Sequence, residues 1–250
     1  VVFGFFLPIC LLLYYAATQG DQLLGKSFYV FVKNSFSVAG ITAILITILG
    51  VWLSYANRVD NGKFMRLVIS SSTLGYALPG TIIAIGTITI FTNIDLYLAR
   101  QITIITQKPA SLLITGTISL LIFAYVVRFL TVGYNACNSG LEKINKRYDE
   151  ISYNLGKKPL QIIQKVHLPL ILPAVTTSFL LVFIDVTKEL PATLILRPFN
   201  FETLATRVYR LASDERLFEA STAALCIVFL GLIPTLIIAK RIFNNRPARR

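Results

Sequence analysis

Charged residues are scarce in this chain. Only 14% of its 250 residues are charged, whereas a soluble domain carries about 25%. Hydrophobic residues make up 55% of the chain, and they gather in long runs between short polar segments. Because a helix needs about 20 apolar residues to cross a bilayer, several of these runs are long enough to span one. The composition argues against a soluble enzyme and predicts a multi-pass protein embedded in a lipid membrane.

Histidine and cysteine are also nearly absent. His167 is the single histidine, and the three cysteines, Cys10, Cys137 and Cys226, are widely separated. This spacing matches neither a disulfide framework nor a zinc motif. One histidine without a recognisable nucleophile pattern gives no sign of a Ser-His-Asp triad. We therefore expect no catalytic residue, no metal site and no cofactor in this chain.

The net charge of +12 could indicate nucleic-acid binding, but the basic residues lie in short segments beside apolar runs. We therefore expect no nucleic-acid partner. Lysine and arginine concentrate in cytoplasmic loops of membrane proteins, which predicts that the most basic loops and the C-terminus are cytoplasmic. The basic residues of these segments are Arg58, Lys63, Arg66, Lys143, Lys146, Arg147, Lys157, Lys158, Lys165, Lys240, Arg241, Arg246, Arg249 and Arg250.

Six apolar runs predict the fold. Lipid cannot satisfy backbone N–H and C=O groups, so each run should form a helix. We expect an all-α membrane protein with six transmembrane helices at residues 1–17, 36–56, 67–91, 110–131, 170–186 and 220–239. The chain begins at Val1 inside an apolar run and without methionine. We interpret it as one domain that forms the C-terminal half of a longer protein.

The third run contains a proline and a glycine, Pro79 and Gly80. Proline removes a backbone donor and clashes with the preceding helical turn, so it predicts a kink or a break inside the membrane. Helices that line the pathway of a transporter are often interrupted in this way. A simple packing kink explains the same residues equally well, and both interpretations remain open.

Ionisable residues near the fifth run are the other pathway candidates. Asp185 and Glu189 share a helix face if the helix continues past them, and Lys188 could pair with Asp185. A salt bridge at the outer end of the helix is the simpler interpretation of these residues. Arg128, near the end of the fourth run, is explained by snorkelling towards the headgroups.

The segment 135–169 is the longest predicted cytoplasmic loop. An apolar stripe at helical spacing is followed by Gly156, which is typical of a helix end, and by Pro159, which favours the first turn of a new helix. A second, shorter stripe follows, and Leu168 and Pro169 lead back to the membrane. The first stripe consists of Leu141, Ile144, Tyr148, Ile151 and Leu155.

This loop resembles the coupling loop of type I ABC importer permeases, the MetI-like fold. The family pattern is E-A-A-x-x-x-G, nine residues, then I-x-L-P. The chain keeps the spacing of this pattern. Ile151 and Ser152 replace the two alanines, and Val166 replaces the isoleucine. The matching residues are Glu150, Ile151, Ser152, Gly156, Val166, Leu168 and Pro169. The resemblance implies docking of this loop on a separate ATP-binding cassette subunit that hydrolyses ATP. It also implies a second permease half, a periplasmic substrate-binding protein and the bacterial inner membrane. An amphipathic hairpin on the membrane surface without a partner is the alternative.

Residues 20–27 (GDQLLGKS) fit the P-loop pattern G-x-x-x-x-G-K-S, and the apolar residues before Asp185 imitate a Walker B strand. The P-loop pattern binds phosphate only between a buried strand and a helix. No soluble α/β pattern surrounds it here, so we expect no nucleotide binding by this chain. A membrane-bound P-loop enzyme is the weakest alternative.

Four further segments, 76–80, 188–198, 201–206 and 212–216, resemble the ferric-iron branch of these permeases. The resemblance implies import of ferric iron. Thiamine, phosphonate and other small solutes remain as alternative substrates, because permeases for them share the same plan. A secondary transporter or channel is the alternative from another class, but the coupling-loop spacing disfavours it. The segment 201–216 is predicted to be a short external helix that contacts a delivery protein through Arg207 and Arg210.

Overall fold

The computed structural model describes residues 2–21, 25–60, 62–109 and 111–244. Every regular element in these ranges is helical and none is a strand, which confirms the all-α prediction. The α-helices are α1 (Leu7–Thr18), α2 (Lys26–Val59), α3 (Lys63–Thr73), α4 (Gly80–Thr106), α5 (Ile118–Leu141), α6 (Arg147–Asn154), α7 (Pro159–Ile162), α8 (Leu168–Thr187), α9 (Pro191–Leu196), α10 (Leu204–Ser213) and α11 (Leu217–Asn244). Short π or 3₁₀ turns are η1 (Val2–Phe6), η2 (Leu74–Ala77) and η3 (Ile163–His167).

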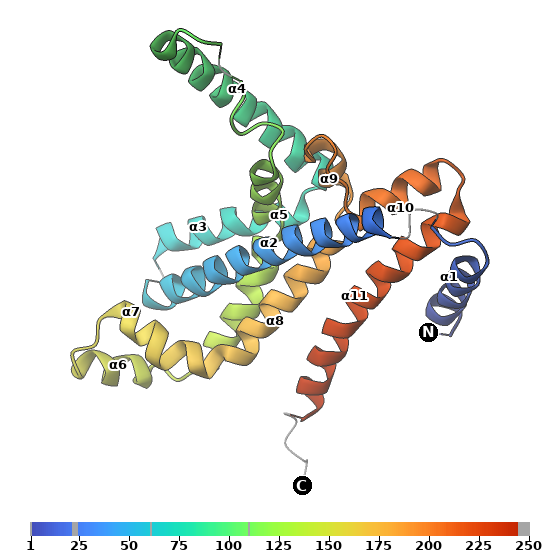
Figure 1. Ribbon diagram of the computed structural model, residues 1–250. Helices are drawn as coiled ribbons and strands as arrows, with labels where there is room; N and C mark the ends of the chain where they lie inside the picture. The colour runs from blue at the N-terminus through green and yellow to red at the C-terminus, as the bar shows by residue number, and fades with distance from the viewer. Residues whose placement is uncertain (1, 22–24, 61, 110, 245–250) are drawn as a thin grey trace.

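The helices α2, α5 and α8 form the core of the molecule (Figure 1). Small residues allow close packing, since a Cβ added to Gly50 of α2 would lie 2.9 Å from the backbone of Gly133 in α5. Small side chains at helix contacts are typical of membrane bundles, where van der Waals packing drives association. The interior is otherwise filled by aliphatic residues such as Leu121 and Val182 and by aromatic ones such as Tyr125 and Phe129.

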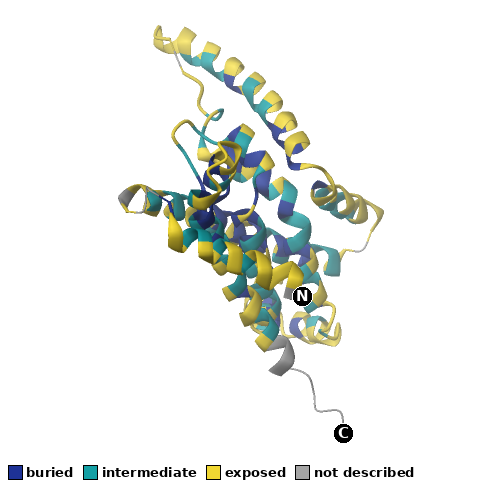
Figure 2. Ribbon diagram, turned by 90° about the vertical axis from the view of Figure 1, so that its right-hand side faces the viewer, coloured by how far each residue is buried: buried dark blue, intermediate teal, exposed yellow. Residues whose placement is uncertain are grey.

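The remaining long helices lie outside this core. α4 projects away from the bundle, and α11 packs on α8, α10 and α1 (Figure 1). Exposed residues cover much of these outer helices, whereas buried ones gather in the centre (Figure 2). Among the described residues, five helical segments are long and apolar enough to cross a membrane, and Phe3–Thr18 is a shorter apolar one. The predicted first run begins at Val1, which lies outside the described residues.

The third predicted run, 67–91, differs from the structure. It is divided between α3 and α4, and the membrane-length helix is α4 (Gly80–Thr106). Leu78 is extended with ψ 141°, and Pro79 with ψ 139° precedes the first residue of α4. The residue before a proline is disfavoured in helical conformation, so the chain breaks here instead of bending.

The fourth predicted run, 110–131, begins and ends too early. Ala110 lies outside the described residues, and α5 covers Ile118–Leu141, so the predicted loop from residue 135 begins inside a helix. Asp95, which falls between the third and fourth predicted runs, lies in α4, and the segment before α5 folds against it. Its carboxylate is fully buried and accepts hydrogen bonds from the amides of Leu113, Ile114 and Thr115.

The other helices are longer than their apolar runs. α2 begins ten residues before the predicted start at Phe36, and the last run is extended to Leu217–Asn244. The predicted fifth run lies within a longer helical segment, Pro159–Thr187, which consists of α7, η3 and α8. α6 and α7 form a hairpin at one end of the core, and α9 and α10 lie at the other end (Figure 1).

Candidate functional site

A glycine turn joins α6 to α7 at the end of the core. Gly156 has φ +71°, a left-handed conformation that favours glycine. Its N–H donates to the carbonyl of Tyr153 at 2.9 Å, and the N–H of Lys157 donates to that of Ser152 at 3.1 Å. These bonds satisfy the last carbonyls of α6. Pro159 is the first residue of α7, so the predicted sequence of helix, glycine turn and second helix is confirmed.

The outer face of this hairpin is apolar and uncovered. The exposed fraction is 58% for Ile151, 71% for Leu155 and 59% for Leu160. The prediction of one continuous stripe is corrected, because residues 142–146 interrupt the helix. Leu141 is therefore buried against the core, while Ile151 and Leu155 face outward.

The other residues of the coupling pattern divide between the surface and the interior. Glu150 and Pro169 are exposed, Val166 and Leu168 are half-buried, and Ser152 is buried. Ser152 is held by a hydrogen bond to the carbonyl one turn earlier in α6. The pattern therefore includes both residues that are available to a partner and residues that fix the hairpin on the core.

A polar cluster behind the hairpin escaped sequence reasoning. Asp149 accepts hydrogen bonds from Arg58 Nε at 2.8 Å and from His167 Nε2 at 2.6 Å. The ring of His167 also lies against Tyr55, with 5.6 Å between centroids. Only one weak signal was available, namely that the single histidine of the chain falls within the coupling pattern next to Leu168.

A second charged site lies at the break before α4. Arg128 Nε lies 3.4 Å from Glu189 Oε2, and both side chains are mostly buried. A Cβ on Gly80 would lie 2.3 Å from the Arg128 guanidinium and 2.6 Å from Glu189 Oε1. The glycine after Pro79 therefore leaves the space in which the ion pair forms. Arg128 lies in the middle of α5, so the snorkelling interpretation is wrong.

Asp185 and Glu189 do not share a helix face, because α8 ends at Thr187. Asp185 instead forms the predicted pair with Lys188, at 2.8 Å between Oδ1 and Nζ. Asp185 also lines an open groove of about 1120 Å³, bounded mainly by α5 and α8. Of the four pathway candidates, the structure brings Gly80 and Glu189 together and places Asp185 in this separate groove.

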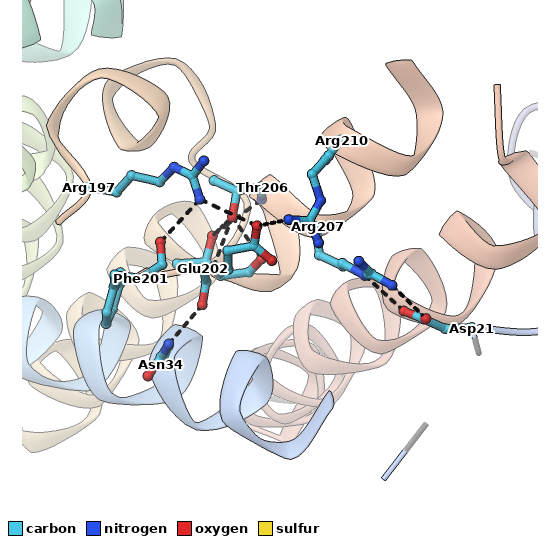
Figure 3. A network of polar contacts seen from close by, with 9 residues as sticks. Asp21, Asn34, Arg197, Phe201, Glu202, Thr206, Arg207 and Arg210 are labelled. Atoms are coloured by element: carbon cyan, nitrogen blue, oxygen red, sulfur yellow. Dashed lines mark hydrogen bonds and ion pairs between the residues drawn. The ribbon is translucent and has the colours of Figure 1, made fainter. Parts of the chain in front are cut away.

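At the opposite end, a network of polar contacts fixes α10 to the rest of the molecule (Figure 3). Arg207 donates from Nε and NH2 to the two carboxylate oxygens of Asp21, at 3.0 and 2.7 Å. These hydrogen bonds hold the pKa of Arg207 above its ordinary value. Arg210 pairs with Glu202, whose carbonyl accepts from Asn34 of α2 at 2.9 Å. The short helix predicted over 201–216 is present, but buried Arg207 cannot contact a delivery protein.

Residues 46–247 match the protein family described as binding-protein-dependent transport system inner membrane component. The match covers the hairpin, the charged break and the core except for the first part of α2. The chain belongs to this family. The chain is therefore a multi-pass membrane component of a transport system.

The names of known relatives of this transport component refer to different solutes. The chain is 27% identical to the "Fe(3+)-transport system permease protein FbpB 2" of Haemophilus influenzae, over 98% of the chain and 47% of that protein. It is 25% identical to the "Putative 2-aminoethylphosphonate transport system permease protein PhnV" of Salmonella typhimurium, over 92% of the chain and 86% of that protein. The chain thus spans about half the length of the ferric permease that it matches.

Two solved structures support the fold of this transport component. A bacterial alginate ABC transporter aligns with a TM-score of 0.71 and 16% identity, over 98% of this chain and 88% of that one. The MetNI methionine ABC transporter in its inward-facing form aligns with a TM-score of 0.61 and 16% identity, over 87% of this chain and 95% of that one. Both confirm the MetI-like permease fold.

The P-loop pattern of this transport component has the wrong context for phosphate binding. Residues 22–24 of the pattern lie outside the described residues. The element before it is helix α1 and the element after it is helix α2, whereas the motif binds phosphate between a strand and a helix. Asp21, within the pattern, is held by Arg207 of α10.

The buried pair between Arg207 and Asp21 should be sensitive even to a conservative change. Lysine keeps the positive charge at position 207 but loses the bidentate fork. We expect Arg207→Lys to lower the free energy of unfolding by about 1.5 to 3 kcal/mol. The measurement is the melting temperature of the protein in detergent. Arg210→Lys is the control, because its half-exposed pair with Glu202 should change stability by less than about 1 kcal/mol. Equal effects of both changes would contradict this prediction.

Proposed function

We propose that this chain is a permease half of an ATP-binding cassette importer that moves ferric iron from a periplasmic binding protein into the cytoplasm. The assignment of ferric iron as the substrate is supported by the 27% identity to a ferric permease over 98% of the chain. The segments around Gly80 and Glu189 that resemble the ferric branch also form the charged site in the membrane domain. ATP would be hydrolysed by a separate subunit.

The hairpin is the proposed docking element for that ATPase subunit. Its outer residues form an apolar row, and burial of apolar surface is the dominant favourable term in most protein association. The glycine turn fixes the angle between α6 and α7, and so presents the row on one face. The proposed coupling residues are Glu150, Ile151, Ser152, Gly156, Val166, Leu168 and Pro169. This assignment places the hairpin and the C-terminus on the cytoplasmic side.

A second permease half is the proposed partner within the membrane. The chain spans 47% of the length of the ferric permease to which it is similar, which supports its interpretation as one half of such a permease. The groove that Asp185 lines, between α5 and α8, is open. We propose that the solute passes between the two halves, near Pro79, Gly80, Asp185 and Glu189.

The residues along the proposed path should bind the solute only weakly. Among the residues that the structure describes, no group of three or more His, Cys, Asp or Glu side chains could hold a metal ion. A permeating ion must bind weakly enough to leave, so a transient contact with one carboxylate at a time fits the passage of a ferric cargo. Hard oxygen donors, such as the carboxylate of Asp185, suit such an ion.

Uptake of radioactive ferric ion tests this function. We expect iron-starved cells that lack the chain and any redundant iron importer to lose most uptake, and a plasmid copy to restore it. Uptake should require the ATPase subunit and should persist when the proton gradient is collapsed but ATP is kept. Dependence on the gradient instead would indicate a secondary transporter. Unchanged iron uptake without the chain would remove ferric iron as the substrate.

Phosphonate import is the second candidate. The 2-aminoethylphosphonate permease is matched over 86% of its length, so its overall size agrees better with this chain than that of the ferric permease. Growth on 2-aminoethylphosphonate as the only phosphorus source separates the two. Growth that depends on the chain, together with normal iron uptake in its absence, would favour the phosphonate.

A further inference from the structure

Two charged side chains behind the hairpin, those of Arg58 and Asp149, connect four segments of the chain. Arg58 lies at the end of α2, Asp149 in α6, and His167 in η3 directly before α8. Besides its bonds to Asp149, Arg58 donates from NH1 to the carbonyl of Leu141 at 2.8 Å and from NH2 to that of Ile144 at 2.9 Å. Because Leu141 is the last residue of α5 and Ile144 lies three residues beyond it, the cluster connects the hairpin to all three core helices.

The cluster does more than fill space. The exposed fraction of the side chain is 8% for Arg58, 16% for Asp149 and 2% for His167. Buried ionic groups lose so much hydration that apolar residues of the same size often stabilise a protein equally well. Here a neighbouring apolar cluster that includes Ile162 and Ile171 already attaches the hairpin. Stability alone therefore gives no reason for placing the charges here.

Charged hydrogen bonds differ from apolar contacts in that they fix direction. Apolar surfaces can slide over each other at little cost, whereas a guanidinium and a carboxylate hold a defined geometry. Asp149 accepts from two sides at once, from Arg58 and from His167. The hairpin therefore cannot rotate on the core without breaking at least one of these bonds.

We propose that Arg58, Asp149 and His167 form a rigid joint that makes the hairpin, α2 and α8 move as one body. The inference rests on the proposed function, in which an ATPase subunit displaces the hairpin. Asp149 is then a positioning residue: it touches neither solute nor nucleotide, and it transmits the movement of α6 to the core. Without the joint, the hairpin would still bind the ATPase subunit, but the movement of the hairpin would not be transmitted to the core helices.

The first test compares Asp149→Asn with the wild-type chain in the assembled transporter. The reconstituted system contains the ATPase subunit and a binding protein loaded with radioactive ferric ion. We expect the ATPase subunit to bind normally and to hydrolyse ATP, while the iron transported per ATP falls about tenfold, within the usual range of coupling between sites. Asp149→Glu, which keeps the charge, should recover part of this ratio. Glu142→Gln, an equal charge change at an exposed residue of the same loop, should leave it unchanged.

A second test does not depend on the solute. Spin labels are placed on Lys157 of the hairpin and Trp52 of α2, which are both exposed, after the native cysteines are replaced by serine. In the wild type, we expect the distance between the labels to stay the same when ATP and vanadate are added. In Asp149→Asn it should change with nucleotide. His167→Phe, which keeps a ring but loses the bond to Asp149, should behave in the same way and serves if Asp149→Asn does not fold.

The outcomes separate the joint from the proposed function. An unchanged transport ratio and an unchanged label distance in both variants would overturn the joint. If the label distance in the variants differs from that of the wild type by the same amount with and without nucleotide, the cluster has a structural role only. If the ATPase subunit does not bind the wild-type chain, the proposed function fails. The joint is then judged on the isolated protein, where equally narrow distance distributions in wild type and variants overturn it.

Discussion

Replacing Glu189 with methionine should destabilise the protein more than replacing Glu189 and Arg128 together. The single change leaves the Arg128 guanidinium mostly buried without its partner carboxylate, and breaking a buried ion pair costs about 3 to 5 kcal/mol. Removing both charges leaves no unpaired ion, and such replacements are often neutral. The melting temperature in detergent should fall by about 10 °C for the single variant and recover most of this loss in Arg128→Met/Glu189→Met.

The pair between Asp185 and Lys188 provides the matched control. Lys188 is 60% exposed, so Asp185→Asn should change the free energy of unfolding by less than about 1 kcal/mol. Equal losses of stability in the Glu189 single variant and in the double variant would contradict the prediction. That result would mean that the two side chains stabilise the break before α4 independently of each other.

Transport by the double variant decides between the two interpretations of Glu189. If the ion pair serves only to hold α5 against the break before α4, the stable double variant should transport solute at a rate near that of the wild type. If the carboxylate lies on the solute path, transport should stay low although the protein is folded. Gly80 provides a third variant, because Gly80→Ala places a methyl group 2.6 Å from the Glu189 carboxylate and should separate the pair.

The second large effect is expected at the outer face of the hairpin. Leu155→Asp should strongly weaken binding of the ATPase subunit, because a charge would replace an exposed leucine of the proposed interface. Loss of one such contact weakens binding by about 2 to 4 kcal/mol, or roughly 30- to 1000-fold. Binding can be measured with purified ATPase subunit and detergent-solubilised permease, and uptake in cells should fall to background.

The folded state should tolerate this change. Leu155 is 71% exposed in the free chain, and exposed substitutions usually alter stability by about 0.5 kcal/mol or less. Asn154→Asp adds the same charge at the neighbouring exposed position without removing an apolar contact, and it should leave binding nearly intact. Normal binding by Leu155→Asp would remove the hairpin as the docking element, and weak binding by both variants would indicate that charge alone disturbs the interface.

The helical fold could be predicted because lipid leaves a chain few alternatives. Long apolar runs must become helices, and the turn at Gly156 followed from a local rule about helix ends. The pair between Asp185 and Lys188 could also be predicted, since the two residues are only three positions apart in the sequence. These features depend on residues that are close in the sequence, and for that reason they could be inferred without the structure.

Features that depend on distant residues could not be predicted. A carboxylate inside a span resembles the end of the span in sequence, so hydropathy predicts a loop at Asp95, whereas the structure shows the backbone amides that bind its carboxylate. Arg128 was assigned to the membrane surface because Glu189, its partner 61 residues later, cannot be recognised from sequence. The cluster of Arg58, Asp149 and His167 joins residues that are up to 109 positions apart. Hydropathy gives no information about such partners.

The close crossing of α2 and α5 at Gly50 and Gly133 has a mechanical consequence. Backbones in direct contact can pivot but cannot approach further, so the crossing acts as a fulcrum for α2. From Gly50, the helix extends about 12 Å to Arg58 at the hairpin end and about 22 Å to Ser35 at the other. Ser35 accepts a hydrogen bond from the first residue of α10 at 2.8 Å. A tilt of α2 that moves its hairpin end by 1 Å would therefore carry the α10 end about 2 Å in the opposite direction.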